Sequence, residues 1–294
     1  MVNRDSYRIH QITILTEAFS SGSFWARWKN RLDPYRRDPA AEQAPDLKVR
    51  NAFDWEPSGE WRLVKTVKAG ICAMDVRMND AGDTLWEYYR EKNREMYVRY
   101  WMSGAYDEIR LLYDDSRTAG YLPFELLEQL MPSVMLKHDS VTFHGVLMEH
   151  EGRGIILSAP SGVGKTTHAR LWRDCKRALI LNGDRATCCV ENGKWVGFSL
   201  PWSGTSGECI NRDVPLTAFV ALEQAKENCV EQLYGLDAFG AVIPNLICPA
   251  WDRALTEKAL DYINDFIEQI PVFRLRCRPD VESVEVLDRA LSEL

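Results

Sequence analysis

The chain has 294 residues, of which 46% are hydrophobic and 27% are charged, and its net charge is −7. This length allows one large domain or two smaller ones, each with a buried core. The mildly acidic balance argues against a basic surface for nucleic acid, so we expect no nucleic-acid partner.

The spacing of the cysteines and the length of the apolar runs indicate the cell compartment in which the protein is expected. None of the eight cysteines forms a C-x-x-C pair, and no spacing is typical of a zinc site. The first residues lack the apolar stretch of a signal peptide, and the uncharged run 239–251 is too short to cross a bilayer. We therefore expect a cytoplasmic protein with no membrane partner and with reduced, mostly buried thiols.

Residues 1–136 have the pattern of a β-rich α+β domain. The proline-containing segment 38–60 predicts a surface loop. Four runs that alternate apolar and polar residues or are rich in Tyr and Trp predict a small antiparallel meander. These runs are 61–68, 84–90, 96–102 and 108–114. Apolar residues at helical spacing predict a helix over 123–136.

From residue 137 to residue 294 the pattern changes to strands mixed with helices, which predicts a second domain of α/β class. The expected strands are 141–149, 154–158, 179–182, 216–222 and 271–277. The expected helices are 165–173, 253–269 and 280–291. Trp195 and Trp202 are expected in the core or in loop packing, and His168 should face solvent or the sheet.

The segment that joins the second expected strand to the first expected helix follows the P-loop pattern, with alanine where the first glycine usually stands. It consists of Ala159, Pro160, Ser161, Gly162, Val163, Gly164, Lys165, Thr166 and Thr167. Backbone N–H groups in such a loop, and at the helix start behind it, bind phosphates. The two glycines allow backbone conformations that are closed to other residues.

Lys165 adds a charge for the β- and γ-phosphates, and the Thr166 hydroxyl is a candidate ligand of Mg²⁺. The alternative is a glycine-rich turn with an exposed lysine. An apolar strand leads into the motif and a helix-compatible segment leads out of it. This context favours a nucleotide site, with ATP and Mg²⁺ as the expected cofactors.

A carboxylate follows the strand 179–182, about twenty residues after the lysine. P-loop proteins place an acid on the Mg²⁺ side in this way, because a strand beside the P-loop strand ends near the phosphates. Asp184 is therefore the second candidate metal ligand. The alternative is a simple turn, which the tripeptide Asn-Gly-Asp also favours.

These residues, with the run Phe143-His-Gly-Val-Leu-Met upstream, resemble the HPr kinase/phosphorylase family, which is related to the phosphoenolpyruvate carboxykinases. The stretch from His144 to Thr167 can be laid on the family without a gap. The resemblance covers 141–213, and none is visible in 1–136. It implies a P-loop core of the HPr kinase/carboxykinase type and transfer of the γ-phosphoryl group to serine in a small protein or precursor peptide.

The resemblance also implies that His144 belongs to the catalytic site, beside the acid at the end of the next strand. The alternative is a core histidine satisfied on its strand. The family has two adjacent aspartates where this chain has Gly183 and Asp184. Three candidates for the catalytic base therefore stay open, namely Asp184, His144 and an acid from elsewhere.

A Gly/Ser/Thr-rich loop at 201–212 stands where the family has a further signature loop with a glutamate. We expect Glu208 to help hold Mg²⁺ and Arg212 to offset charge on the transferred phosphoryl group. The alternative is a surface loop with solvated charges. The alternating Arg274, Arg276 and Arg278 could meet an acidic peptide or phosphates, or pair with neighbouring acids.

Three functions follow from these observations. The leading one is a kinase that phosphorylates a hydroxyl, with the β-rich domain recognising the acceptor. The second is a nucleotide-binding switch or scaffold without transfer, suggested by the missing aspartate. The third is a carboxykinase-like small-molecule enzyme, for which the five histidines offer few metal ligands. Members of the family form oligomers, so the resemblance implies a homo-oligomer.

Overall fold

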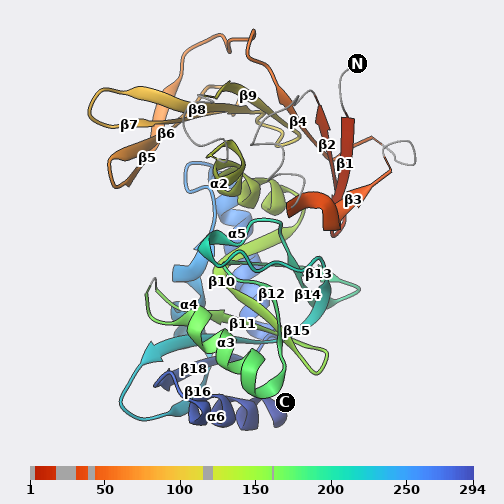
Figure 1. Cartoon of the computed structure of the whole chain (residues 1–294), viewed down its shortest axis with the longest axis vertical. Helices are drawn as coiled ribbons and strands as arrows, with labels where there is room; N and C mark the ends of the chain where they lie inside the picture. Colours follow the sequence, from red (N-terminus) through yellow and green to blue (C-terminus); the bar gives the residue numbers. More distant parts are fainter. Residues whose placement is uncertain (1–3, 18–30, 39–43, 115–121, 161) are drawn as a thin grey trace. The chain divides into compact units, whose positions relative to one another are not determined.

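The computed structural model describes residues 4–17, 31–38, 44–114, 122–160 and 162–294. The chain divides into two compact units, Met1–Val134 and Met135–Leu294. The division falls close to the change of pattern at residue 137. Large sheets combined with helices give the chain a mixed α/β architecture (Figure 1).

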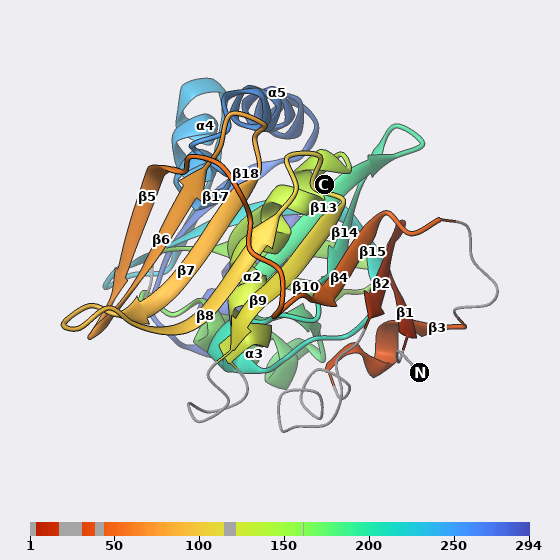
Figure 2. The same cartoon turned by 90° about the horizontal axis from the view of Figure 1, so that it is seen from above.

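The first unit is built on a sheet with the strand order β3-β1-β2-β4-β9-β8-β7-β6-β5. Its strands are β1 (Arg4–Ile9), β2 (Ile12–Glu17), β3 (Arg36–Arg37), β4 (Leu47–Asn51), β5 (Arg62–Ala69), β6 (Cys72–Met78), β7 (Thr84–Arg90), β8 (Glu95–Met102) and β9 (Glu108–Asp114). A short 3-10 helix, η1 (Asp33–Tyr35), precedes β3. Figure 2 shows β5 to β9 lying side by side, and each neighbouring pair is antiparallel. The predicted meander is therefore confirmed, although β6 was missed.

The prediction of a loop over 38–60 is wrong for β4. This strand pairs in parallel with β2 and β9, and it buries Leu47 and Val49. Residues 39–43 of the predicted loop lie outside the described residues. The helix α2 (Leu122–Lys137) confirms the prediction for 123–136, and the Tyr100 hydroxyl of β8 donates to the Pro123 carbonyl at 2.7 Å.

The strands of the second unit form one connected nine-stranded network. The network divides into two sheets, which share the long strands β10 (Ser140–His150) and β15 (Asp213–Gln224). The first halves of these strands pair with β13 (Arg185–Glu191) and β14 (Lys194–Ser199). The short strand β17 (Leu246–Ile247) pairs with β10 in this first sheet. The second halves flank β11 (Arg153–Ser158), antiparallel to β10 and parallel to β15. The strands β12 (Leu179–Asn182), β18 (Val272–Cys277) and β16 (Cys229–Leu233) extend this second sheet.

Helices cover both faces of the second sheet because its strands alternate apolar side chains between the faces. On one face, Leu157 of β11 and Val220 of β15 share a core with Trp172 of α3 (Lys165–Lys176) and Leu287 of α6 (Val281–Ser292). On the other face, Phe219 of β15 packs edge-on against Phe266 of α5 (Arg253–Gln269). The short helix α4 (Gly235–Val242) contacts α5 and is followed by the 3-10 helix η4 (Ile243–Asn245).

The predicted elements of the second unit are confirmed in type, with α5 and β12 at the expected bounds. Trp195 and Trp202 are buried, as expected. None of the eight cysteines, all of which lie in the described ranges, forms a disulfide, but only Cys72, Cys188 and Cys189 are buried, so the expectation of mostly buried thiols holds in part. Across the described ranges, no helix combines the length and apolarity needed to cross a bilayer.

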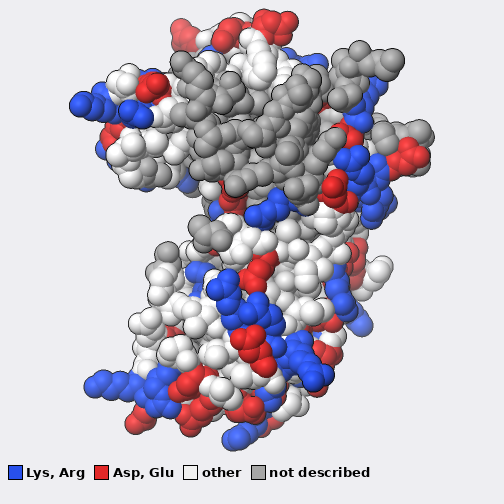
Figure 3. Space-filling model, viewed as in Figure 1, with Lys and Arg blue, Asp and Glu red and all other residues white. Residues whose placement is uncertain are grey.

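Charges on the second unit are arranged in pairs rather than in patches of one sign. Figure 3 shows basic and acidic side chains intermixed on the face it presents. The arginine stripe on β18 follows this rule. Arg274 and Arg276 each contact Glu223 and Glu231, and Arg278 contacts Asp280 and Glu282. The three arginines thus pair with neighbouring acids, which was the second of the two alternatives.

Candidate functional site

The loop between β11 and α3 has an open, concave backbone. Gly162 and Gly164 have φ angles of 82° and 117°, which side chains rarely allow. A Cβ atom at either position would meet nothing within 4 Å among the described residues, so φ rather than crowding requires glycine there. The Gln224 side chain of β15 donates to the Val163 carbonyl at 3.2 Å and so links the loop to the sheet. Ser161 lies outside the described residues.

Lys165 is the first residue of α3, and its side chain folds back over the loop. Its Nζ donates to the Ala159 carbonyl at 2.7 Å and lies 3.2 Å from Nε2 of His144. The side chain is buried, and burial lowers the Lys165 pKa while the nearby Asp184 carboxylate opposes this shift. Thr166 follows in the first turn of α3 and is half-buried, whereas Thr167 is exposed.

His144 and Asp184 meet at the point where β10 passes from one sheet to the other. The Gly145 N–H donates to the Asp184 carbonyl at 3.0 Å, and Nδ1 of His144 lies 3.4 Å from Oδ1 of Asp184. Burial is the main cause that lowers the pKa of His144; the charges of Lys165 and Arg185 add to it, and Asp184 opposes it. An ammonium can only donate, so Nε2 accepts from charged Lys165 and the ring proton is assigned to Nδ1, facing the carboxylate.

Asn182 supports this arrangement and was missed as a functional residue. Its Oδ1 accepts from the N–H groups of Asp184 and Arg185 at 3.0 and 2.7 Å, and its buried Nδ2 donates to the Leu200 and Trp202 carbonyls. The two alternatives given for Asn-Gly-Asp, a simple turn and a functional acid, therefore do not exclude each other, because the turn positions the Asp184 carboxylate. The tripeptide itself was the signal that could have identified this role.

The loop after β14 lies over Asp184 and over the position of the missing aspartate. A Cβ atom on Gly183 would overlap the Ser206 hydroxyl and lie 2.7 Å from the Ser206 Cβ. Ser206 belongs to the 3-10 helix η3 (Gly204–Ser206), and a Cβ atom on Gly204 would lie 2.8 Å from the Asp184 carboxyl carbon. Residues 203–207, the covering loop, therefore leave no space for a second carboxylate at Gly183.

Glu208 and Arg212 are not brought to Lys165. The Glu208 carboxylate contacts Arg173 at 2.9 Å and Arg170 at 3.5 Å, on the outer face of α3. Arg212 forms a two-pronged ion pair with Glu149, with both N–O distances 2.8 Å. Glu149 pairs with Gly154, four residues before the strand end from which the loop leaves, which is about 13 Å along β11. Both side chains are paired with partners outside the loop between β11 and α3.

The donors that remain for Mg²⁺ are the Thr166 hydroxyl and the Asp184 carboxylate. Both are hard oxygen ligands, and Mg²⁺ needs only one or two of these because it keeps waters and binds substrate phosphates. Within the part of the chain that the structure describes, no group of three His, Cys, Asp or Glu side chains could hold a metal alone. By the chemistry of their oxygens, Thr166 and Asp184 stay candidates for the ion, whereas the Glu208 carboxylate is paired with Arg170 and Arg173.

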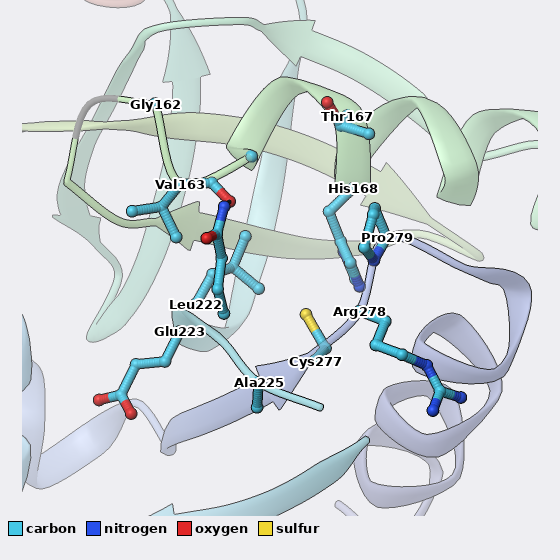
Figure 4. Close-up of a pocket in the computed structure, with 12 residues that line it drawn as sticks. Gly162, Val163, Thr167, His168, Leu222, Glu223, Ala225, Cys277, Arg278 and Pro279 are labelled. Atoms are coloured by element: carbon cyan, nitrogen blue, oxygen red, sulfur yellow. Dashed lines mark hydrogen bonds between the residues drawn. The ribbon is translucent and has the colours of Figure 1, made fainter. Parts of the chain in front are cut away.

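A pocket of about 420 Å³ adjoins the loop on the side of Gly162, Gly164 and Thr167 (Figure 4). His168 of α3 lines it and is 2% exposed, so it faces neither open solvent nor a polar partner. Neither of its ring nitrogens has a hydrogen-bond partner among the described residues. Burial lowers the pKa of His168 to about 4, and the Asp280 charge opposes this shift.

Similarity to known proteins is found among solved structures. No family model matches this chain, and no curated protein matches it. Among solved structures, the chain is similar to the HPr(Ser) kinase/phosphatase from Coxiella burnetii at 10% sequence identity. The similarity covers 52% of this chain and 96% of that chain, with a TM-score of 0.32. A TM-score this low carries no argument about function, which rests instead on the residues of the site.

Proposed function

We propose that the chain is a kinase that binds ATP and Mg²⁺ at the loop 159–167 and transfers the γ-phosphoryl group to a hydroxyl. The proposed acceptor is a serine in a small protein or precursor peptide, recognised with help from the first unit. The observation that carries the proposal is the group formed by the buried Lys165 and the half-buried His144 and Asp184 at the start of α3. A cation, a neutral imidazole and a carboxylate meet there, beside an open backbone loop.

In this proposal the loop N–H groups and the start of α3 bind the phosphates, and Lys165 reaches the β- and γ-phosphates. Its burial favours exchange of the Ala159 carbonyl for a phosphate oxygen, because a buried ammonium gains most from an anionic partner. Mg²⁺, held by Thr166 and through a water by Asp184, would neutralise charge on the phosphate oxygens when bound and leave the carboxylate able to take a proton. The remaining requirement is a group that accepts the proton of the acceptor hydroxyl.

Asp184 is our candidate for that base. The His144 Nε2 is already occupied by Lys165, so the imidazole serves to position the carboxylate rather than to take a proton. The acceptor oxygen forms a bond to the γ-phosphorus as the bond to the β–γ bridging oxygen breaks, and the hydroxyl proton passes to the carboxylate. The products are a phosphoester and ADP.

The test is transfer from γ-labelled ATP with Mg²⁺ to a library of serine-containing peptides, followed by mass spectrometry. We expect Lys165→Ala to abolish transfer and Asp184→Asn to reduce it at least a hundredfold. Lys176→Ala is the matched control, because Lys176 lies on the same helix but pairs with Glu285 and Asp288. Transfer that survives in Lys165→Ala would refute the proposal.

A second candidate function is a nucleotide-binding switch without transfer. The covering loop favours it, because Gly204 lies against the Asp184 carboxylate and narrows the access of an acceptor hydroxyl to it. In that case ATP binds in a Lys165-dependent manner, no peptide is labelled, and hydrolysis is negligible. Binding with transfer excludes the switch as the sole function.

A further inference from the structure

The pocket beside the loop has one end that faces the phosphates and a body that does not. Gly162, Gly164 and Thr167 form the end next to the loop. Lys165 is not among the described residues that line the pocket, and its side chain contacts His144 instead. Because the lysine of such a loop reaches the β- and γ-phosphates, the pocket lies on the side of the α-phosphate and the nucleoside.

The walls of the pocket are mostly apolar. Figure 4 shows Val163 and Leu222 on one side and Pro279 on the other, with the Cys277 thiol between them. Burial raises the pKa of Cys277 to about 11, so its thiol stays uncharged. The volume of about 420 Å³ falls within the range of about 300–1,000 Å³ that is typical of small-molecule sites.

The charged residues at the rim are already neutralised. Arg278 donates to Asp280, to Glu282 and to the Lys226 carbonyl. The Glu223 carboxylate contacts Arg274 and Arg276. Among the described residues that line the pocket, both charged side chains are thus paired, so the pocket suits an uncharged group better than a second anion.

His168 supplies the polar group that such a pocket needs. Figure 4 shows its ring reaching from α3 toward Cys277 and Pro279. Both ring nitrogens are buried and unpartnered among the described residues, which is costly unless a ligand completes the hydrogen bonding. A neutral imidazole has one donor and one acceptor, which point in different directions, so one of them can meet an acceptor or a donor on the edge of a purine.

We propose that this pocket binds the purine ring of the nucleotide, with His168 as the residue that hydrogen-bonds the ring edge. The inference rests on the proposed binding of a nucleoside triphosphate at the loop. It adds the prediction that the base, and not only the phosphates, contributes to affinity. Pyrimidine nucleotides, with a single ring, fill less of the apolar space.

The test compares the binding of ATP, GTP, CTP and inorganic tripolyphosphate, all with Mg²⁺, to the full chain by calorimetry. For the wild type we expect ATP or GTP to bind at least tenfold more tightly than CTP and tripolyphosphate. His168→Phe should weaken binding of the purine nucleotide about tenfold, the value of one buried hydrogen bond, and change tripolyphosphate binding less than twofold. His168→Gln, which keeps a donor and an acceptor, should restore part of the loss.

A second variant guards against misfolding of the His168 replacements. Ala225 lines the pocket from the end of β15, outside α3, and Ala225→Phe fills the space without leaving a buried polar group. It should abolish the preference for purines and preserve tripolyphosphate binding. If the wild type bound all four ligands equally, or if both variants weakened the binding of all four equally, the purine pocket would be refuted and the nucleotide site at the loop would stand. Absence of binding for every ligand would overturn the nucleotide site itself.

Discussion

Replacing Gly183 with alanine introduces only a methyl group, yet the structure leaves no room for it. The added Cβ would overlap the Ser206 hydroxyl and lie 2.7 Å from the Ser206 Cβ. Rotation of Ser206 cannot relieve the contact with Cβ, and it would break two hydrogen bonds of the hydroxyl, to the Ser203 carbonyl and from the Glu208 N–H. Overpacking of this kind costs about 1–3 kcal/mol, and each lost hydrogen bond about 0.5–1.5 kcal/mol. We expect Gly183→Ala to lower the free energy of unfolding by about 2–6 kcal/mol, the sum of these contributions.

A double-mutant cycle with Ser206→Gly separates this contact from other causes. Ser206→Gly removes both atoms that the methyl group would meet, so the double variant should recover about 1–2 kcal/mol relative to the sum of the single variants. The assay is urea unfolding at neutral pH followed by tryptophan fluorescence, for which the buried Trp195 and Trp202 report on the second unit. Gly183→Ala within about 0.5 kcal/mol of the wild type, or a strictly additive cycle, would refute the claim that the covering loop fills this space.

Three further predictions concern other parts of the site. The pKa of His168 is about 4 in the folded chain and about 6.5 in the unfolded chain, so between these pH values the unfolded chain binds one more proton. The free energy of unfolding should therefore fall by about 3 kcal/mol from pH 7 to pH 4, and urea titrations of His168→Phe should lack this fall. Asn182→Ala should destabilise the chain by about 3 kcal/mol or more in the same assay, since it removes buried hydrogen bonds to Leu200 and Trp202, and a cost below about 1 kcal/mol would contradict the role given to the turn. Arg212→Ala should change the rate of phosphoryl transfer less than twofold. A tenfold loss in the labelling assay would show that Arg212 acts in the transfer reaction after all.

Patterns of short range predicted much of this structure. The bounds of α5 follow from its apolar spacing, and the loop at 159–167 follows from residues adjacent in sequence. The strand β4 was missed because the strands that pair with it are distant in sequence. Its partners β2 and β9 lie far away along the chain, and the prolines around it indicated a loop.

The site was predictable to a similar extent. His144, Lys165 and Asp184 converge as the resemblance implied, since strand order fixes where consecutive strands end. The side chains of Glu208 and Arg212 lie elsewhere because each found an ion-pair partner that no local pattern reveals. His168 could not be recognised either, since a histidine inside a helix gives no sign of the pocket that β15 and β18 build around it.

The division of β10 between two sheets restricts where the chain can change its length. His144 pairs with Arg185 in one sheet, and Gly145 pairs with Ser158 in the other. An insertion of a single residue near this junction would turn His144 to the opposite face and misalign one of the two ladders. The turns around Asp139 and Glu151, where φ is positive, lie outside both ladders and can absorb such changes. Sequence drift in this chain should therefore appear as loops of variable length at 138–139 and 151–152, with a β10 of constant length between them.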